Sequence, residues 1–170
     1  QAEDGIRDVE RSRGLGDVYK RQVYETDRGG QVTYHGPGQQ VVYPIVNIRD
    51  WGGPVKYVRA LEQVVIATLT GMGITATCES GNTGVWTDQG KIAAIGVKIT
   101  RGIAFHGFAL NVNTDLTYYN NIIPCGIADR PVTSMSAILG QSVDMELVRY
   151  GLVYQFGREF GFRMEDWALT

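Results

Sequence analysis

Residues 28–39 read RGGQVTYHGPGQ, and the rest of the chain is organised around this stretch. Four glycines, a proline and a histidine stand together here with almost no large apolar side chain between them. Glycine allows positive φ angles and close approach of the backbone to a ligand, and proline fixes a turn. Two interpretations stay open. The backbone is shaped around a ligand, with the polar ends of Tyr34 and His35 facing a cavity, or it forms a tight surface turn between strands.

The composition is that of an ordinary globular domain. The chain has 170 residues, of which 44% are hydrophobic and 20% charged, and this length fits one domain. A net charge of −2 argues against nucleic acid as a partner, and no apolar run approaches the roughly 18 residues that cross a bilayer. With only Cys78 and Cys125, the sequence has no disulfide framework and fits a reducing compartment.

The first 22 residues differ in character from the rest. They read QAEDGIRDVERSRGLGDVYKRQ, with many charges and no helical or strand period, so one interpretation is a disordered arm. A second comes from the genetic code, since codons that encode residues 1–8 and 12–22 resemble widely used sequencing-library adapters. We expect residues 1–22 to be a non-native, adapter-derived extension, and residues 23–170 to form a single domain that is incomplete at its N-terminal end.

Short β-rich runs dominate the middle of the chain. Pro44 lies inside the first of them, which indicates an edge position or a bulge. Glycine-containing turns separate the later runs and predict an antiparallel meander. The predicted strands are 40–48, 74–78, 84–87, 91–100 and 103–112.

Two helices are expected to cover this sheet. Apolar residues recur at helical spacing over 55–69, with Lys56, Arg59 and Glu62 predicted on the solvent-exposed face. A final helix is predicted over 144–160, after a short one capped by Thr133. Two helices against a mostly antiparallel sheet make an α+β domain.

Cys125 stands between a proline and a glycine in a predicted loop, which suits an accessible thiol better than a core residue. A cysteine reacts as the thiolate, and its ordinary pKa of about 8.5 leaves it mostly protonated at neutral pH. A nearby ammonium group lowers that pKa. Lys91, which opens the apolar run 92–97, is the candidate, although a solvated hairpin lysine is the alternative. Lys98 competes with it, but strand alternation disfavours Lys98.

His35 and His106 each precede a glycine. Either is a candidate general base for Cys125 in a cysteine–histidine arrangement. Together with Cys78 they match no compact zinc-binding spacing, so we predict no metal site.

Four motifs together resemble the lipoyl(octanoyl) transferase family. They are RGGQVTYHGPGQ at 28–39, KIAAIG at 91–96, HGFALNV at 106–112 and PCGI at 124–127, and VTSM at 132–135 is also similar. The resemblance implies the fold of biotin and lipoate protein ligases, with a mixed, mostly antiparallel sheet flanked by helices. In the family a motif similar to EHPPVYTLG precedes the glycine-rich stretch, so we expect that portion to be missing here.

The resemblance also implies the roles of particular residues. Cys125 is the nucleophile that carries the acyl group as a thioester, and Lys91 lowers the pKa of the thiol and acts as acid and base. The substrate-binding residues that it implies are Arg28, Gly29, Gly30, Gln31, Val32, Thr33, Tyr34, His35, Ala94, Ile95, Gly96, Gly107, Phe108 and Ala109.

The implied activity is transfer of an octanoyl or lipoyl group from acyl carrier protein, in the cytoplasm and without a cofactor. The acceptor is a lysine on lipoyl domains of 2-oxoacid dehydrogenases or on the H protein of glycine cleavage. Three alternatives stay open. One is an ATP-dependent lipoate or biotin ligase, which a nucleophilic cysteine disfavours. The others are a cysteine-dependent thioester hydrolase and a non-catalytic acyl-binding module.

Overall fold

The computed structural model of the chain describes residues 23–122 and 130–165. In order along the chain, these residues form β1 (Gln39–Val42), β2 (Val46–Asn47), α2 (Pro54–Gly71), β3 (Val85–Thr87), β4 (Gly90–Thr100), β5 (Ile103–Asn111), the 3-10 helix η1 (Leu116–Asn121), α3 (Met135–Leu139) and α4 (Met145–Phe160).

The strands form one sheet in the order β1-β5-β4-β3, and neighbouring strands run antiparallel. β2 also pairs with β5, beyond the end of β1. The β4–β5 hairpin turns at Arg101 and Gly102, whose φ angles of 52° and 82° are the positive values that a two-residue I′ turn needs. The predicted antiparallel meander over 84–112 is therefore confirmed.

Pro44 divides the predicted run 40–48 into β1 and β2. Proline has no N–H group for the sheet ladder, so a strand is interrupted where it occurs or lies at the edge of a sheet. Among the described strands, both pieces pair only with β5, on the side away from β4. The prediction of an edge position is confirmed.

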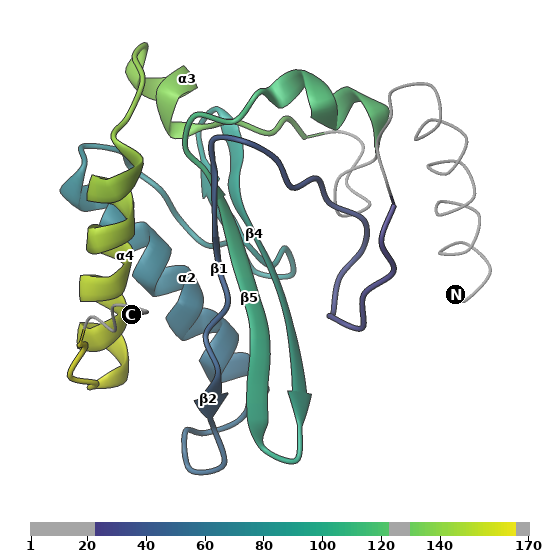
Figure 1. The fold of residues 1–170 in the computed structure, drawn as a ribbon, viewed down its shortest axis with the longest axis vertical. Coiled ribbons are helices and arrows are strands. Elements are labelled where there is room, and N and C mark those ends of the chain that lie inside the picture. Colours follow the sequence, from purple (N-terminus) through teal and green to yellow (C-terminus); the bar gives the residue numbers. More distant parts are fainter. Residues whose placement is uncertain (1–22, 123–129, 166–170) are drawn as a thin grey trace, which may run out of the picture.

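Helices α2 and α4 pack together and cover one face of the sheet (Figure 1). Leu61, Val65 and Leu69 of α2 are buried in the core that results. Phe160 of α4 stacks on Trp51, with 4.8 Å between the ring centroids. In the parts of the chain that the structure describes, no helix has both the length and the apolar character of a membrane span.

The starts of the two later helices follow from their capping residues. The Asp144 carboxylate accepts hydrogen bonds from the backbone N–H groups of Glu146 and Leu147, so α4 begins where predicted. The side chain of Ser134 accepts a bond from the N–H of Ala137 and caps α3. The predicted cap, Thr133, lies one residue too early.

Two other expectations are wrong. Residues 74–78 form no strand and make only an isolated bridge, in which Thr77 and Trp86 exchange two backbone hydrogen bonds of 2.8 Å. Glu62 does not face solvent but is fully buried. Its Oε2 lies 2.6 Å from Nη1 of Arg59, and its Oε1 accepts a 2.9 Å hydrogen bond from the N–H of Gly84. Helical periodicity could not reveal this position, because one partner comes from a loop 22 residues away.

The segment 23–38 lies across the other face of the sheet, opposite α2 and α4 (Figure 1). The N–H of Gly29 donates a 2.9 Å hydrogen bond to the carbonyl of Val97 in β4. The neighbouring Gly96 permits this approach, because a Cβ there would lie 2.7 Å from the carbonyl oxygen of Gly29. Asp27 bridges two further side chains of the sheet, with 2.7 Å to Nζ of Lys98 and 2.8 Å to Nε2 of His106.

We expect Tyr57→Phe to raise the free energy of unfolding by about 1 kcal/mol. The Tyr57 hydroxyl is buried with no hydrogen-bond partner among the described residues, whereas it binds water in the unfolded chain. Burial also raises the pKa of this phenol to about 12. Tyr119→Phe is the control, since its hydroxyl bonds to Asn111 and Gln39, and it is expected to cost stability. Urea unfolding measures both, and a less stable Tyr57→Phe would contradict the expectation.

We expect Asp27→Asn to weaken the fold in a pH-dependent way. Hydrogen bonds from Lys98 and then His106 lower the pKa of Asp27 from 3.8 to about 2. A lowered pKa in the folded state contributes stability above the unfolded value, and this is lost as the pH falls toward the folded value. In urea unfolding the difference between wild type and Asp27→Asn should therefore shrink from about pH 4 to about pH 2. Asp88→Asn, in the exposed β3–β4 turn, is the matched control.

Candidate active site

A β-bulge near the start of β4 determines the orientation of Lys91. Trp86 pairs with Lys91, whereas the preceding residue, Val85, pairs with Ala93, so β4 has one extra residue, Ile92, at this point. Directly opposed residues share a face of the sheet, and successive residues of a strand alternate between faces. Lys91 therefore shares the face of Trp86, and Ala93 shares the opposite face with Val85.

The bulge keeps a charged amine out of the hydrophobic core. Val85 and Ala93 both belong to the core under the helices. Strict alternation from Ala93 would point Lys91 into the same core. Because the bulge at Ile92 interrupts this alternation, Lys91 instead lies on the face that segment 23–38 crosses. Bulges are frequent beside active sites, where they redirect a side chain.

Lys91 is almost buried on this face, with 6% of its surface exposed. Its Nζ lies 5.2 Å from the ring centroid of Trp86, within cation–π range. Within the described residues no carboxylate lies in salt-bridge contact with this ammonium group. Lysine is almost never buried unless it is paired. The alternative of a solvated hairpin lysine is therefore wrong.

Arg130 packs on the same indole ring as Lys91. The guanidinium carbon of Arg130 lies 4.1 Å from the Trp86 ring centroid, and its Nη1 pairs with the Glu79 carboxylate. This hydrogen bond holds the pKa of Glu79 below its ordinary value. Neither Trp86 nor Arg130 was predicted as a site residue, and both stand out only through this contact.

The segment after Arg130 joins the sheet beside Lys91. The backbone N–H of Lys91 donates to the carbonyl of Pro131, and the N–H of Thr133 donates to the carbonyl of Lys91, both at 2.9 Å. Val132 thereby forms a parallel bridge with Lys91. These hydrogen bonds therefore join residues 130–133 to the beginning of β4.

The structure brings together the three segments that the sequence predicted as substrate-binding. Ala94 lies opposite Ala109, and Gly96 lies opposite Gly107, so these four small residues share one face. Residues 28–31 lie over that face through the contact of Gly29 with β4. Ile95 and Phe108 are a different case, since their side chains pack in the helix-covered core and only their backbone remains near this face.

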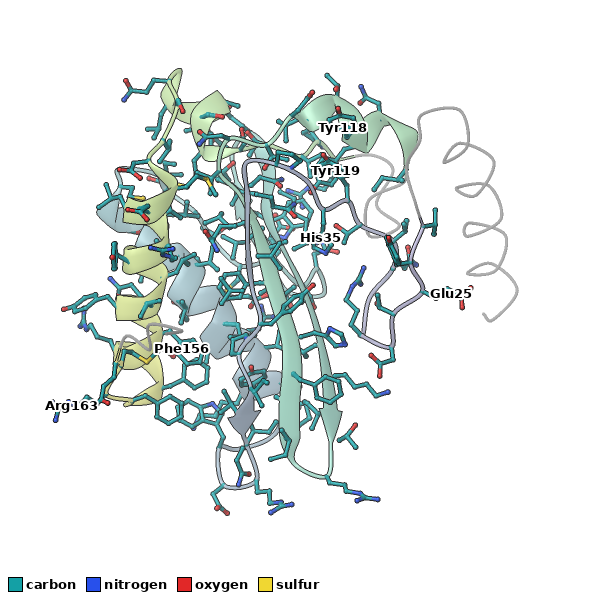
Figure 2. All side chains as sticks on the ribbon, viewed as in Figure 1. Glu25, His35, Tyr118, Tyr119, Phe156 and Arg163 are labelled. Atoms are coloured by element: carbon teal, nitrogen blue, oxygen red, sulfur yellow. The ribbon has the colours of Figure 1, made fainter. Side chains whose placement is uncertain are left out.

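Two amides, the buried Asn111 and the half-buried Gln39, connect the glycine-rich stretch with this part of the sheet. Nε2 of Gln39 donates to Oδ1 of Asn111 at 2.9 Å, and Oδ1 of Asn111 also accepts from the Tyr119 hydroxyl at 3.2 Å. Nδ2 of Asn111 donates to the carbonyl of Thr133 at 3.0 Å. His35 and Tyr119 lie on the face away from the helix residue Phe156 (Figure 2). The sequence offered one signal, an asparagine at the end of an apolar strand.

The two histidines occupy different parts of this face. Nδ1 of His35 lies 2.7 Å from Oε1 of Gln39, near the Asn111 end. His106 pairs with Asp27 and lies opposite Val97, six residues along β4 from Lys91. At about 3.3 Å per residue the separation is about 20 Å, so His106 and Lys91 do not belong to one reaction centre.

Cys125, the predicted nucleophile, lies outside the described residues, as does the rest of the PCGI motif. Cys78 is described, half-buried and free. The role of Cys125 therefore remains a prediction.

Comparison with known proteins agrees with this fold. Residues 16–157 match the family described as lipoyl protein ligase A/B catalytic domain. An octanoyltransferase of Koribacter versatilis is 51% identical over 154 residues, which are 87% of this chain and 60% of that protein. The chain thus spans about three fifths of the length of this curated relative.

Two solved structures are similar in fold. A lipoate-protein ligase A bound with ATP has a TM-score of 0.80 at 16% identity, over 93% of this chain and 66% of that chain. A biotin protein ligase from Aquifex aeolicus has a TM-score of 0.59 at 18% identity, over 73% and 53% of the two chains. These confirm the predicted α+β fold, and the octanoyltransferase match confirms the predicted resemblance. The chain belongs to the lipoyl protein ligase A/B catalytic domain family.

Proposed function

We propose that this protein transfers an octanoyl or lipoyl group from acyl carrier protein to a lysine of lipoyl domains, through a thioester on Cys125. The observation that carries the proposal is the ammonium group of Lys91, almost buried and without a described carboxylate partner. It lies on the face of the sheet that residues 28–38 cross. The 51% identity to an octanoyltransferase supports the choice of reaction.

Chain connectivity supports the pairing of Cys125 with Lys91. Pro131, whose carbonyl accepts a hydrogen bond from the backbone of Lys91, follows Cys125 by six residues. Six residues span at most about 20 Å even when fully extended. This length permits the contact between the Cys125 thiol and the Lys91 ammonium group that the proposal requires.

In the first half of the reaction the Cys125 thiolate attacks the carbonyl carbon of the octanoyl thioester. A new C–S bond forms, the bond to the carrier thiol breaks, and that thiol leaves as a thiolate. The Lys91 ammonium stabilises the attacking thiolate and gives its proton to the leaving one. One thioester replaces another, so the step needs no ATP.

In the second half the neutral amine of the acceptor lysine attacks the Cys125 thioester. An amide C–N bond forms and the C–S bond breaks, which returns the Cys125 thiolate. The amine must lose a proton on attack, and Lys91, now neutral, accepts it. The ammonium–thiolate pair is restored.

The proposed acyl site uses the face that Ala94, Gly96, Gly107 and Ala109 share. Arg28 and Gly29 pack directly over Gly96, and Val42 and Pro44 pack over Gly107, so the alkyl chain is proposed to lie beside these contacts, over the methyl groups of Ala94 and Ala109. Burial of an eight-carbon chain at about 0.8 kcal/mol per methylene contributes roughly 5 kcal/mol. Residues 28–35 would complete the binding surface from the other side.

Intact-mass measurement with a synthetic octanoyl thioester tests the proposal. We expect an octanoyl adduct without ATP that passes to an apo lipoyl domain. The adduct should be absent in Cys125→Ser and unchanged in Cys78→Ser, the matched cysteine control. Prompt release of free octanoate would indicate a hydrolase. An adduct that requires ATP would indicate a ligase, and no adduct at all would leave only acyl binding. Each of these three results would contradict the transferase.

We expect Lys91→Met to slow acyl transfer by at least about 100-fold, because the thiolate loses its counter-charge and both half-reactions lose their proton carrier. Lys98→Met is the matched control, since Lys98 lies on the same strand but pairs with Asp27. It is expected to leave the transfer rate within about twofold of the wild type. Single-turnover kinetics with excess enzyme measures both, and equal rates for the two variants would contradict the role of Lys91.

A further inference from the structure

Glu62 is a charged residue in an unexpected place. It lies in the middle of α2 with none of its surface exposed. Burial of a carboxylate is costly unless hydrogen bonds and a counter-charge compensate it. Both of its oxygens have partners, since Oε2 contacts Arg59 at 2.6 Å and Oε1 accepts from the N–H of Gly84 at 2.9 Å.

The Lys91 side chain packs against the backbone of Gly84. A Cβ at Gly84 would lie 2.5 Å from Cε and 3.1 Å from Nζ of Lys91, so the lysine occupies the space that any other residue would fill. The φ angle of Gly84, +129°, is also one that side-chain-bearing residues rarely adopt. The carboxylate of Glu62 thus holds the backbone unit against which the last carbon and the nitrogen of Lys91 are packed.

Arg59 extends the same arrangement to the loop before β3. Its two terminal nitrogens each lie 3.4 Å from the carbonyl oxygen of Glu79, while Nη1 also binds Glu62. The Glu79 side chain in turn pairs with Arg130, which packs on Trp86. Both ends of the loop from Glu79 to Gly84 are therefore fixed by the Arg59–Glu62 pair.

We infer that Glu62 is a positioning residue, which acts through Gly84 to fix the ammonium group of Lys91 over Trp86. The inference rests on the proposed function of Lys91. Glu62 touches no reacting atom itself. A purely structural role explains its burial poorly, because the desolvation of the Glu62 carboxylate offsets much of what its ion pair with the partly exposed Arg59 contributes.

Three variants test the inference in the full chain. Gly84→Ala places a methyl group 2.5 Å from Cε of Lys91 and 2.7 Å from the carbonyl oxygen of Ala93, so it displaces the lysine together with the strand backbone beside it. Glu62→Ala leaves the backbone of Gly84 intact and removes only the acceptor of its N–H. Glu62→Gln keeps the size and a carbonyl acceptor but loses the charge, so it should behave between Glu62→Ala and the wild type. Thr68→Val is the matched control, since Thr68 is a buried polar residue of the same helix whose hydroxyl donates to the carbonyl of Val64 within that helix.

The first readout needs no activity. Nζ of Lys91 lies over the indole of Trp86, so the ring should shift the NMR signals of the Lys91 ε-methylene group. We expect this ring-current shift to be lost in Gly84→Ala and Glu62→Ala, reduced in Glu62→Gln and kept in Thr68→Val. An unchanged shift in folded Glu62→Ala and Gly84→Ala would overturn the inference, whether or not the protein transfers acyl groups.

The second readout is acyl-transfer kinetics. Misplacement of a reacting group by about 1 Å costs on the order of 100-fold in rate. We expect kcat to fall about 100-fold in Gly84→Ala and about tenfold in Glu62→Ala, with KM nearly constant. Glu62→Ala should add no further loss to Lys91→Met. A further loss of equal size would overturn the inference, because Glu62 would then act independently of Lys91. Absence of transfer in the wild type would contradict only the proposed function.

Discussion

The alternation of side chains along β4 is the constraint on which the candidate site depends. The sheet has an apolar face under α2 and α4 and a second face under segment 23–38, and every strand residue must belong to one of them. Lys91 lies on the second face because the bulge at Ile92 interrupts the alternation between Lys91 and Ala93. If Ile92 were paired regularly, Lys91 would share the face of Ala93, and an ammonium group would enter the core, where an unpaired charge costs several kcal/mol.

The polar groups at the two ends of this face differ in how far they are buried and in how easily their contacts break. Near Lys91, the amides of Gln39 and Asn111 link chain segments that are more than 70 residues apart. A hydrogen-bonded network of this kind, with Asn111 buried and Gln39 half-buried, favours one arrangement over others of similar compactness. About 20 Å away, Asp27 pairs with Lys98 and His106 through partly exposed groups, which are easier to break. Segment 23–38 is thus held firmly near the lysine and more loosely at its other end.

Local patterns predicted the parts of the fold that local physics determines. Helical periodicity identified α2 and α4, and the residue pair Arg101 and Gly102 located the central hairpin. Patterns failed where a distant partner decides the outcome. Glu62 has the position of a surface residue on its helix and is buried only because Gly84 and Arg59 satisfy it. Residues 74–78 have strand-like composition, but only Thr77 finds a pairing partner.

In the candidate site, too, the sequence predicted some features, and others depend on partners that are distant along the chain. Lys91 was predicted from its position before an apolar run, but its orientation could not be, because a bulge exists only relative to the strand beside it. Trp86 and Arg130 have no sequence pattern that separates them from ordinary aromatic and charged residues, and Asn111 has only its position at the end of an apolar strand. Their roles arise from contacts with distant parts of the chain: Arg130 packs on the ring of Trp86, and Asn111 accepts a hydrogen bond from Gln39.

The bulge at Ile92 has a consequence for how this gene can change. Replacement of Ile92 by valine alters one buried side chain, and the pairing of β3 with β4 can remain as it is. Deletion of the same codon leaves Lys91 directly before Ala93, so regular alternation alone keeps these two residues on opposite faces, and their pairs with Trp86 and Val85 can remain. Deletion of a codon between Ala93 and Thr100, where β4 pairs with β5 without a shift, instead reverses the faces on one side of the deletion. We therefore expect single-codon deletions among functional relatives to occur at position 92 far more often than at positions 94–99.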